Sequence, residues 1–249
     1  MIKLKPIFLI ILTGVLLNSC TYIYYPNYPV IAEVEDETYG AQVTVGLSKA
    51  QLSGWYAFDS SIFATATLSG ALSWLEERSN DPNNANRPYK TFTATAGVGY
   101  QYKFGKQGIT QILGGGGISQ GHLLTSLFNS ADAGNVLEAI DIDYQSTRIY
   151  LQPSIGASDK NGSFYFIPRL TMENFTNLKP TGSSVNPSLV KRNFIFLEPI
   201  LFKRYLSKEI NIDLYTGVSF TISNDRLTVG DEIIVTQPIM FGLGVSRNF

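Results

Sequence analysis

Apolar and polar residues alternate one by one through most of this chain, and this two-residue period limits the fold more than any other feature. In "GAQVTVGL", Ala41, Val43 and Val45 share one face, whereas Gln42 and Thr44 share the other. Successive side chains of a β-strand point to opposite faces, so each such run indicates a strand with one apolar face. Strands are predicted at approximately 39–47, 50–58, 61–74, 90–104, 108–121, 146–157, 162–173, 193–205, 209–222 and 234–249.

The connections between these runs alternate between short and long. Four are short, namely "FDSS", "FGKQG", "ASDKNGS" and "YLSKE", and four are long, at about 76–89, 122–145, 174–192 and 223–233. A transmembrane barrel has short periplasmic turns and long extracellular loops, whereas a soluble β-sandwich has no reason to sort its loops in this way. We therefore predict an all-β fold, a transmembrane antiparallel up-and-down barrel of about ten strands. Eight or twelve strands stay open, because the first hairpin is weakly marked.

Aromatic residues gather near the predicted short-turn ends, where a barrel carries an interfacial girdle. They are Tyr56, Phe58, Tyr100, Tyr102, Phe104, Phe164, Phe202, Tyr205 and Phe249. A soluble sandwich would instead place its aromatics in mid-strand, inside its core. Their position favours the membrane barrel.

The first residues have the form of a secretory signal peptide, with Lys3 and Lys5 before an apolar run at 7–17 that is too short to span a membrane. The segment closes with "LNSC", which resembles the lipobox of bacterial lipoproteins. That resemblance implies that Cys20 becomes the first mature residue and carries lipid, palmitate included. A lone cysteine in an exported chain has no disulfide partner, which favours lipidation over a chance thiol.

These observations divide the chain into three parts. We predict a cleaved lipoprotein signal peptide at 1–19, a lipid-anchored Pro/Tyr-rich tether at 20–38 and the barrel at 39–249. Charged residues make up only 16% of the chain and the net charge is -1, which gives no basis for binding nucleic acid. One histidine and one cysteine cannot build a transition-metal site, so no metal and no cofactor other than the lipid on Cys20 are expected.

The predicted inward face is polar, as a barrel lumen allows. Its members are Gln111, Arg148, Tyr150, Gln152, Tyr165, Arg169, Glu173, Glu198, Arg204, Asn211, Asp213 and Tyr215. We expect a lumen network built on Arg148, Arg169, Glu198 and Asp213. In it, Arg169 and Glu198 would pair across adjacent strands, because an unpaired buried charge is costly. A ten-stranded barrel is narrow, so these side chains are expected to fill it and to exclude a wide pore.

Three prolines and a glycine run interrupt the predicted strands. Pro153, Pro168 and Pro199 fall on the outward face of consecutive strands, where proline cannot donate to the ladder. They predict either bulges that tune curvature or a face covered by a partner. The run "GGGG" at 114–117 has no phosphate-loop context and indicates curvature or room for a neighbouring aromatic.

Catalysis at the rim is the weaker hypothesis. His122 begins a predicted long loop, and Asp141 and Asp143 end it, in an arrangement similar to that of ten-stranded outer-membrane proteases. Ser119 and Ser126 are the nearby candidate nucleophiles, but their spacing shows nothing specific. We predict that the protein is not an enzyme.

The chain ends on a predicted assembly signal. Phe241, Leu243, Val245 and Phe249 share the outward face of the last strand. A terminal aromatic on such a strand resembles the β-signal read by the barrel assembly machinery, which would act on this chain during biogenesis. The strand is expected to close the barrel against the first one.

The lipobox, the "YPNYPV" tether and the strand motifs "LQPSIGAS", "FLEPI" and "QPIMFGLGV" together resemble small β-barrel lipoproteins of Bacteroidota outer membranes. The resemblance implies an accessory subunit of an outer-membrane complex, such as the barrel assembly or protein secretion machinery. Expected partners are outer-membrane lipid and other outer-membrane proteins. The alternatives are a narrow channel for small solutes and a rim-active hydrolase. Both termini are expected on the periplasmic side, with the lipid in the inner leaflet.

Overall fold

The computed structural model describes residues 26–32, 34, 38–46, 49–71, 90–128, 136–181, 193–207, 210–223, 228–229, 232–233 and 239–249. The predicted signal peptide, Cys20 and the first part of the predicted tether lie outside these residues. Among the described residues, no helix is long and apolar enough to cross a membrane.

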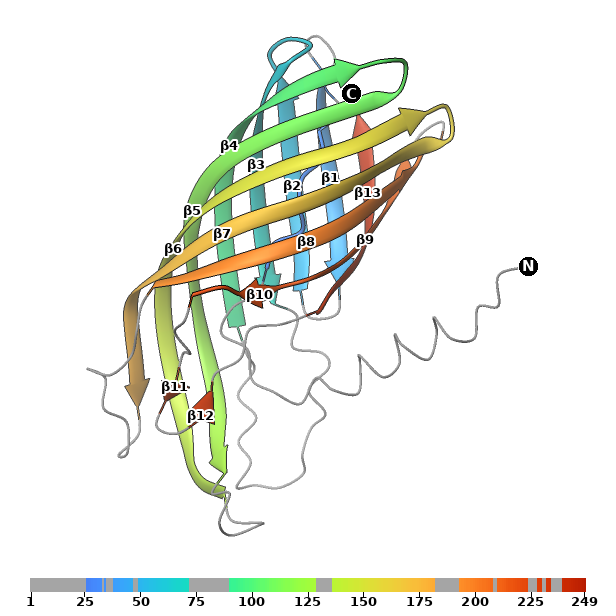
Figure 1. Cartoon of the computed structure of the whole chain (residues 1–249). Helices are drawn as coiled ribbons and strands as arrows, with labels where there is room; N and C mark the ends of the chain where they lie inside the picture. Colours follow the sequence, from blue (N-terminus) through green and yellow to red (C-terminus); the bar gives the residue numbers. More distant parts are fainter. Residues whose placement is uncertain are drawn as a thin grey trace.

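Thirteen strands are formed by the described residues, and most of them wind around one barrel (Figure 1). Their bounds are β1 Tyr39–Gly46, β2 Lys49–Ala57, β3 Ile62–Ala71, β4 Lys90–Phe104, β5 Gly108–Phe128, β6 Val136–Asp159, β7 Gly162–Thr181, β8 Asn193–Tyr205, β9 Asn211–Val218, β10 Phe220–Thr221, β11 Thr228–Val229, β12 Glu232–Ile233 and β13 Ile239–Asn248. Strands β11 and β12 pair only with each other.

The barrel closes on itself through antiparallel neighbours. Each strand from β1 to β8 pairs with the next, β8 pairs with β9, β9 with β13, and β13 returns to β1. The short β10 continues β9 along β8 in the same register, so the two are one strand of the wall. The wall therefore has ten strands, and the predicted fold class, a closed antiparallel barrel of about ten strands, is confirmed.

Side chains alternate between the two faces of the wall, as the sequence period requires. Val43, Leu52, Leu68 and Val98 lie outside and are about half exposed, whereas Gln42, Ser53, Thr67 and Thr95 lie inside and are buried. An outward apolar band around a closed strand cylinder is the signature of an outer-membrane barrel. Phe202 departs from the predicted girdle, because it faces inward and is fully buried.

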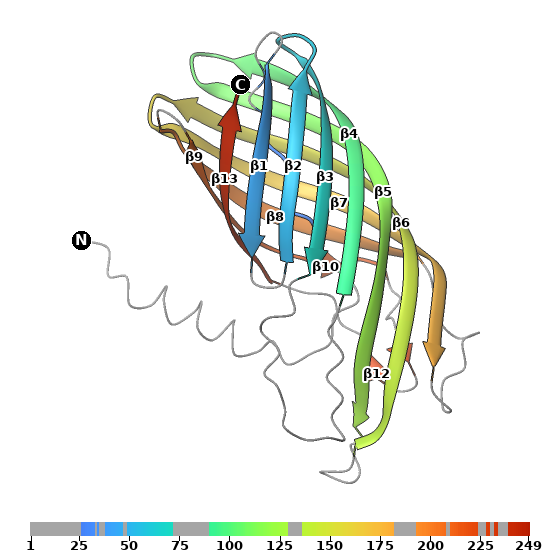
Figure 2. The same cartoon turned by 180° about the vertical axis from the view of Figure 1, so that it is seen from behind.

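Strands β5, β6 and β7 are longer than the sequence predicted, and they extend beyond the rest of the wall (Figure 2). The predicted long loop at 122–145 is therefore largely strand, and the one predicted at 174–192 is strand as far as Thr181. Backbone pairing between β5 and β6 continues from His122↔Asp143 to Phe128↔Val136. This stretch lies beyond Lys90, the first residue of the neighbouring β4. Beyond the membrane band, apolar and polar residues no longer alternate clearly. There the hairpin is held together by hydrogen bonds between its two antiparallel strands.

The three prolines form one row across β6, β7 and β8 and interrupt the ladder without shifting it. Pairing between β6 and β7 stops at Leu151↔Leu170 and resumes at Ile155↔Phe166 in the same register. The second gap lies between β8 and β9–β10, opposite Pro199. These are gaps in hydrogen bonding rather than the bulges considered from the sequence, and two of the prolines share one gap.

The first and last strands meet at the seam that closes the barrel. Phe249 N–H donates to the Tyr39 carbonyl at 2.8 Å, and the two rings stack with centroids 5.4 Å apart. The Arg247 guanidinium lies 5.2 Å from the Phe249 ring centroid. The final aromatic is thus a structural part of the seam.

Deleting Phe249 should reduce the fraction of correctly closed barrel, because it removes one backbone hydrogen bond and the aromatic stack at the seam. Heat-modifiable mobility of the protein in SDS gels measures that fraction. The control is Phe104→Ala, which removes an exposed aromatic at the same end, on β4 and away from the seam. Equal folding of the two variants would contradict a special role for Phe249.

Candidate functional site

The lumen of the barrel is occupied by the chain's own residues 26–32 and 34, which precede β1; we call these described residues segment 26–34. At one end of this segment, Asn27 contacts Lys49 and Ser69, which lie where β2 begins and β3 approaches its end. At the other end, the Val34 carbonyl accepts a hydrogen bond from Gln101, near the short turn at 105–107. The segment therefore runs lengthwise through the interior, from the long-connection end to the short-turn end.

Four inward glutamines, on four strands, bind the backbone of this lumen segment at every second residue. Gln51 of β2 accepts from the Tyr28 N–H and donates to its carbonyl, both at 2.8 Å. The amides of Gln152, Gln111 and Gln101 donate to the next carbonyls in turn, those of Val30, Ala32 and Val34, at 2.9, 2.7 and 3.1 Å. Buried backbone groups must be paired, and here side chains of the wall satisfy them.

Two arginines bind carbonyls on the other side of the segment. Arg169 of β7 donates to the Asn27 carbonyl, and Arg204 of β8 donates to the Ile31 carbonyl at 3.5 Å. The glutamines come from β2, β4, β5 and β6, and the arginines from β7 and β8. The segment is therefore held from much of the circumference of the barrel.

Tyr28 sits in a seat made by two glycines that face each other across the closing seam. Gly46 of β1 pairs with Gly242 of β13, and both point inward. A β-carbon on Gly46 would lie 1.4 Å from the Tyr28 hydroxyl, and one on Gly242 would lie 2.6 Å from the ring. The hydroxyl donates to the Phe241 carbonyl at 2.8 Å. Only residues without a β-carbon leave room for this tyrosine.

Apolar side chains of the segment pack against two clusters on the inner wall, whereas the sequence predicted a polar interior. Tyr28 and Ile31 join one cluster with Tyr165, Ile167, Ile200, Phe202, Tyr215 and Met240. Val30, Ala32 and Val34 join the other with Trp55, Ala57, Phe63 and Leu113. Burial of such side chains is worth about 1.5–3 kcal/mol each for the larger ones. The lumen is therefore a packed core in which the segment is the central layer.

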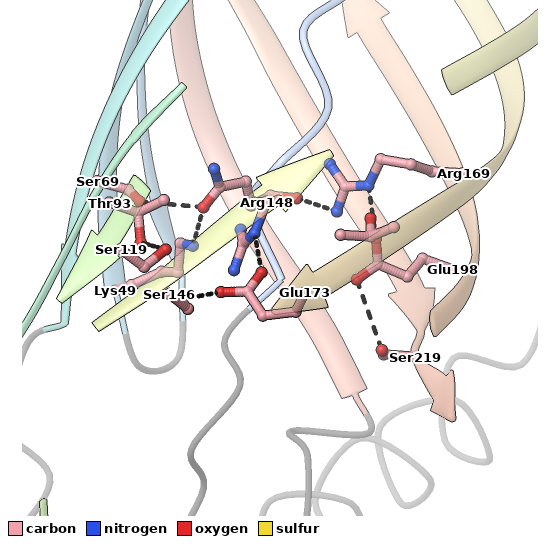
Figure 3. A network of polar contacts seen from close by, with 12 residues as sticks. Lys49, Ser69, Thr93, Ser119, Ser146, Arg148, Arg169, Glu173, Glu198 and Ser219 are labelled. Atoms are coloured by element: carbon pink, nitrogen blue, oxygen red, sulfur yellow. Dashed lines mark hydrogen bonds and ion pairs between the residues drawn. The ribbon is translucent and has the colours of Figure 1, made fainter. Parts of the chain in front are cut away.

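A layer of charged side chains lies toward the long-connection end (Figure 3). Arg148 pairs with Glu173 across β6 and β7, and Arg169 pairs with Glu198 across β7 and β8, each with a 2.6 Å contact from the guanidinium Nε. All four side chains are buried. Ser146 donates to Glu173, and Thr171 donates to Glu198 at 2.9 Å.

Lys49 is also buried in this layer, and its Nζ donates to the Asn27 side-chain oxygen at 2.6 Å. A cavity of about 20 Å³ remains between the segment and the wall, lined in part by Arg148, Tyr150 and Arg169. That volume is enough for about one water molecule.

A second charged centre lies nearer the short-turn end. Arg204 and Asp213 face each other across β8 and β9 and make two contacts, of 2.7 and 3.0 Å. Both are fully buried. Gln42 donates to Asp213, and the Arg204 guanidinium lies 5.3 Å from the Phe202 ring centroid and 5.8 Å from that of Trp55. This pair joins the wall, the lumen segment and both apolar clusters.

The structure thus places Arg148, Arg169, Glu198 and Asp213 inside the lumen but in two separate layers. Arg169 and Glu198 contact each other directly, whereas Arg148 and Asp213 pair with Glu173 and Arg204. Pro153, Pro168 and Pro199 lie on the outer wall, and Cys20 lies outside the described residues.

The candidate rim residues are only partly brought together. His122 Nδ1 lies 2.8 Å from the Asp143 carboxylate, on the outer surface of the β5–β6 hairpin. Ser119 faces the lumen instead and bonds with Thr93 at 3.0 Å. The side chains of Ser126 and Asp141 lie outside the described part of the structure. Across the residues that are described, no group of three or more metal-ligating side chains occurs.

Sequence reasoning missed the lumen segment, although two signals pointed to it. The stretch from Tyr28 to Val34 is too apolar for a solvated tether, with Val30 and Ile31 at its centre. The inner wall also carries large apolar side chains, such as Phe63 and Phe202, that need something to pack against. For the glycine run at 114–117, the sequence left open curvature or room for an aromatic, and at Gly115 the structure shows the second. A β-carbon there would lie 2.5 Å from the Tyr150 hydroxyl.

No protein-family model matches this sequence, and no curated protein matches it. Two solved structures are similar in fold. The translocator domain of autotransporter NalP from Neisseria meningitidis is 11% identical, with 86% of each chain covered and a TM-score of 0.45. The KdgM porin in complex with disordered oligogalacturonate is 11% identical, with 85% of this chain and 99% of that chain covered and a TM-score of 0.33. Neither similarity is close enough to support a statement about function.

Replacing Arg204 with Leu should destabilise the barrel by about 3–5 kcal/mol, because Asp213 would stay buried without its cation. The double variant Arg204→Leu/Asp213→Leu should recover part of that loss. Urea unfolding in detergent, followed by tryptophan fluorescence, measures both. The control is Lys203→Leu, the neighbouring outward residue, and equal stability of the two single variants would refute the ion pair's importance.

Gly46→Ala should displace Tyr28 from its seat and lower the urea midpoint. The control, Gly114→Ala, should be neutral, because nothing lies within 4 Å of the added carbon. In a Tyr28→Ala background, the Gly46→Ala change should cost clearly less, since the clash with the tyrosine is gone and only the 2.7 Å approach to the Phe241 carbonyl remains. Additive effects of the two changes would show that the seat does not bind Tyr28.

Proposed function

We propose that this protein is a lipid-anchored, non-catalytic accessory subunit of an outer-membrane complex, such as the barrel assembly or protein secretion machinery. The observation that carries the proposal is the packed lumen. A barrel whose interior is filled by its own chain offers only its outer wall and its two rims for function. Contacts with lipid and with other membrane proteins use those surfaces, and they need no open pore.

The channel alternative is disfavoured by the same observation. Segment 26–34 is bound through carbonyls from Asn27 to Val34, and the cavity beside it holds about one water molecule. A solute path would require this segment to leave the lumen, breaking its hydrogen bonds and exposing both apolar clusters.

In the hydrolase alternative, the one candidate nucleophile whose side chain is described, Ser119, does not lie beside the candidate base, His122. The His122–Asp143 pair lies on the outside of the wall, while the hydroxyl of Ser119 points into the lumen. A nucleophile must lie within hydrogen-bond reach of the base that activates it. His122→Ala should therefore leave in vivo function unchanged.

The outer wall of β6 to β8 is the proposed partner face, because proline gaps concentrate there. Hydrogen bonding is missing opposite Pro153, Pro168 and Pro199, so this part of the wall can bend to follow a neighbouring surface. Leu151, Leu170 and Leu201 surround the row and point outward, each between 41% and 49% exposed.

Purified wild-type protein should give no conductance steps in a planar bilayer. Replacing residues 26–34 with Gly and Ser should produce steps, because the lumen would lose its central layer. The same replacement at 79–87, in a long connection, is the control and should stay silent. Steady conductance of the wild type would refute the filled lumen and favour the channel alternative.

Photo-crosslinking residues at Leu151, Leu170 and Leu201 should capture a protein partner in native membranes. The same residues at Val43, Leu52 and Leu68, on another part of the wall, should capture mainly lipid. Purification in mild detergent should also recover a stoichiometric partner. Capture of lipid alone at all six positions, with recovery of this chain by itself, would refute the accessory role.

A further inference from the structure

The lumen segment has a direction, and this direction fixes the mouth at which the preceding chain leaves. Asn27 lies level with Ser69, two residues before β3 ends and the long connection begins. Thr38 and Tyr39 lie at the opposite end, where they bond with Ala57 and Phe249. From Asn27 to Thr38, the chain therefore crosses the barrel from the long-connection mouth to the short-turn mouth.

We infer that the mature N-terminus emerges at the long-connection mouth, opposite the C-terminal Phe249, and that the acyl chains on Cys20 lie in the outer leaflet. The leaflet assignment rests on the proposed lipidation of Cys20, whereas the choice of mouth does not. This differs from the sequence-based expectation, in which both termini lie on the periplasmic side.

The length of the preceding chain supports the assignment. Only six peptide steps separate Cys20 from Pro26. At about 3.5 Å per residue they reach at most about 21 Å. The apolar band of a membrane barrel is about 25 Å tall, so this stretch cannot return from the level of Asn27 to the opposite interface. It can pass over the rim, because Asn27 lies against wall residues Lys49 and Ser69.

A return through the lumen is excluded by packing. Ile31 and Ala32 are each 1% exposed. Ile31 packs into one apolar cluster of the inner wall, and Ala32 packs into the other. The cavity of about 20 Å³ beside Tyr28 and Val30 has room for a water molecule but not for a second strand of chain. Asn27 bonds Ser69, which lies two residues before β3 ends at Ala71, so this end of the segment lies close to the long-connection rim.

The acyl chains on Cys20 would therefore insert into the lipid around the long-connection rim. A diacylated cysteine there would hold the N-terminal end of the lumen segment in place from outside. The Phe249 seam holds the other end of the same stretch through Tyr39. The segment would then be fixed at both mouths as well as along its length.

Cysteine accessibility in intact cells tests the inference. Ile23→Cys is treated with a membrane-impermeant maleimide before and after outer-membrane permeabilisation. Asn84→Cys marks the long-connection side, and Lys106→Cys, in the turn at 105–107, marks the short-turn side. Ile23→Cys should react under the same condition, and to a similar extent, as Asn84→Cys. Tyr25→Cys provides a second position if the first variant folds poorly.

Reaction of Ile23→Cys only where Lys106→Cys reacts would overturn the inference, and so would protection under both conditions until denaturation. The wild type separates the two hypotheses, because its single cysteine is Cys20. A lipidated thiol is blocked and should not react. Labelling of the wild type would refute lipidation and the leaflet assignment, and the condition under which Cys20 itself reacts would then report which mouth the chain uses.

Discussion

Satisfying the backbone of one extended segment inside a closed barrel is the requirement on which this structure depends. Segment 26–34 lies where water is excluded, so each of its polar groups needs a partner from the wall. Gln51, Gln152, Gln111 and Gln101 meet this need at successive alternate residues, and two arginines act from the other side. The ion pairs then hold those arginines in position, because each guanidinium also bonds a carboxylate on a neighbouring strand.

The same arrangement explains how charges are tolerated at such depth. A buried ion pair alone adds little stability, since the desolvation of both ions offsets their attraction. Arg204 gains further contacts from Ile31, Phe202 and Trp55, and Glu198 gains them from Thr171 and Ser219. The charged layers thus act as connectors between the wall and the segment. Replacing these charged residues one at a time would measure the contribution of each to stability.

The sequence was sufficient for the wall but not for what fills it. Strict alternation predicted the strands and their faces, because the period of a strand is local and one face had to meet lipid. It missed the extension of β5 to β7. There the strands are held by pairing with a neighbour, and no apolar face toward lipid is needed. It also assigned 20–38 to a tether, because the path of a chain without periodicity depends on contacts such as Gln51 with Tyr28, 23 residues away. The partners of Arg148 and Asp213 likewise follow from register, which the period does not give.

The glycine seat implies an order of assembly. Gly46 and Gly242 belong to the first and last strands, so the space for Tyr28 exists only once β1 and β13 have met. The finished barrel has a packed interior, with Ile31 and Ala32 each 1% exposed, so the segment could not be threaded in afterwards. The wall must therefore be wrapped around a segment that already lies along its axis, with Tyr28 in place as the seam shuts. The barrel is therefore assembled around its own N-terminal segment, and pairing of the last strand with the first encloses that segment.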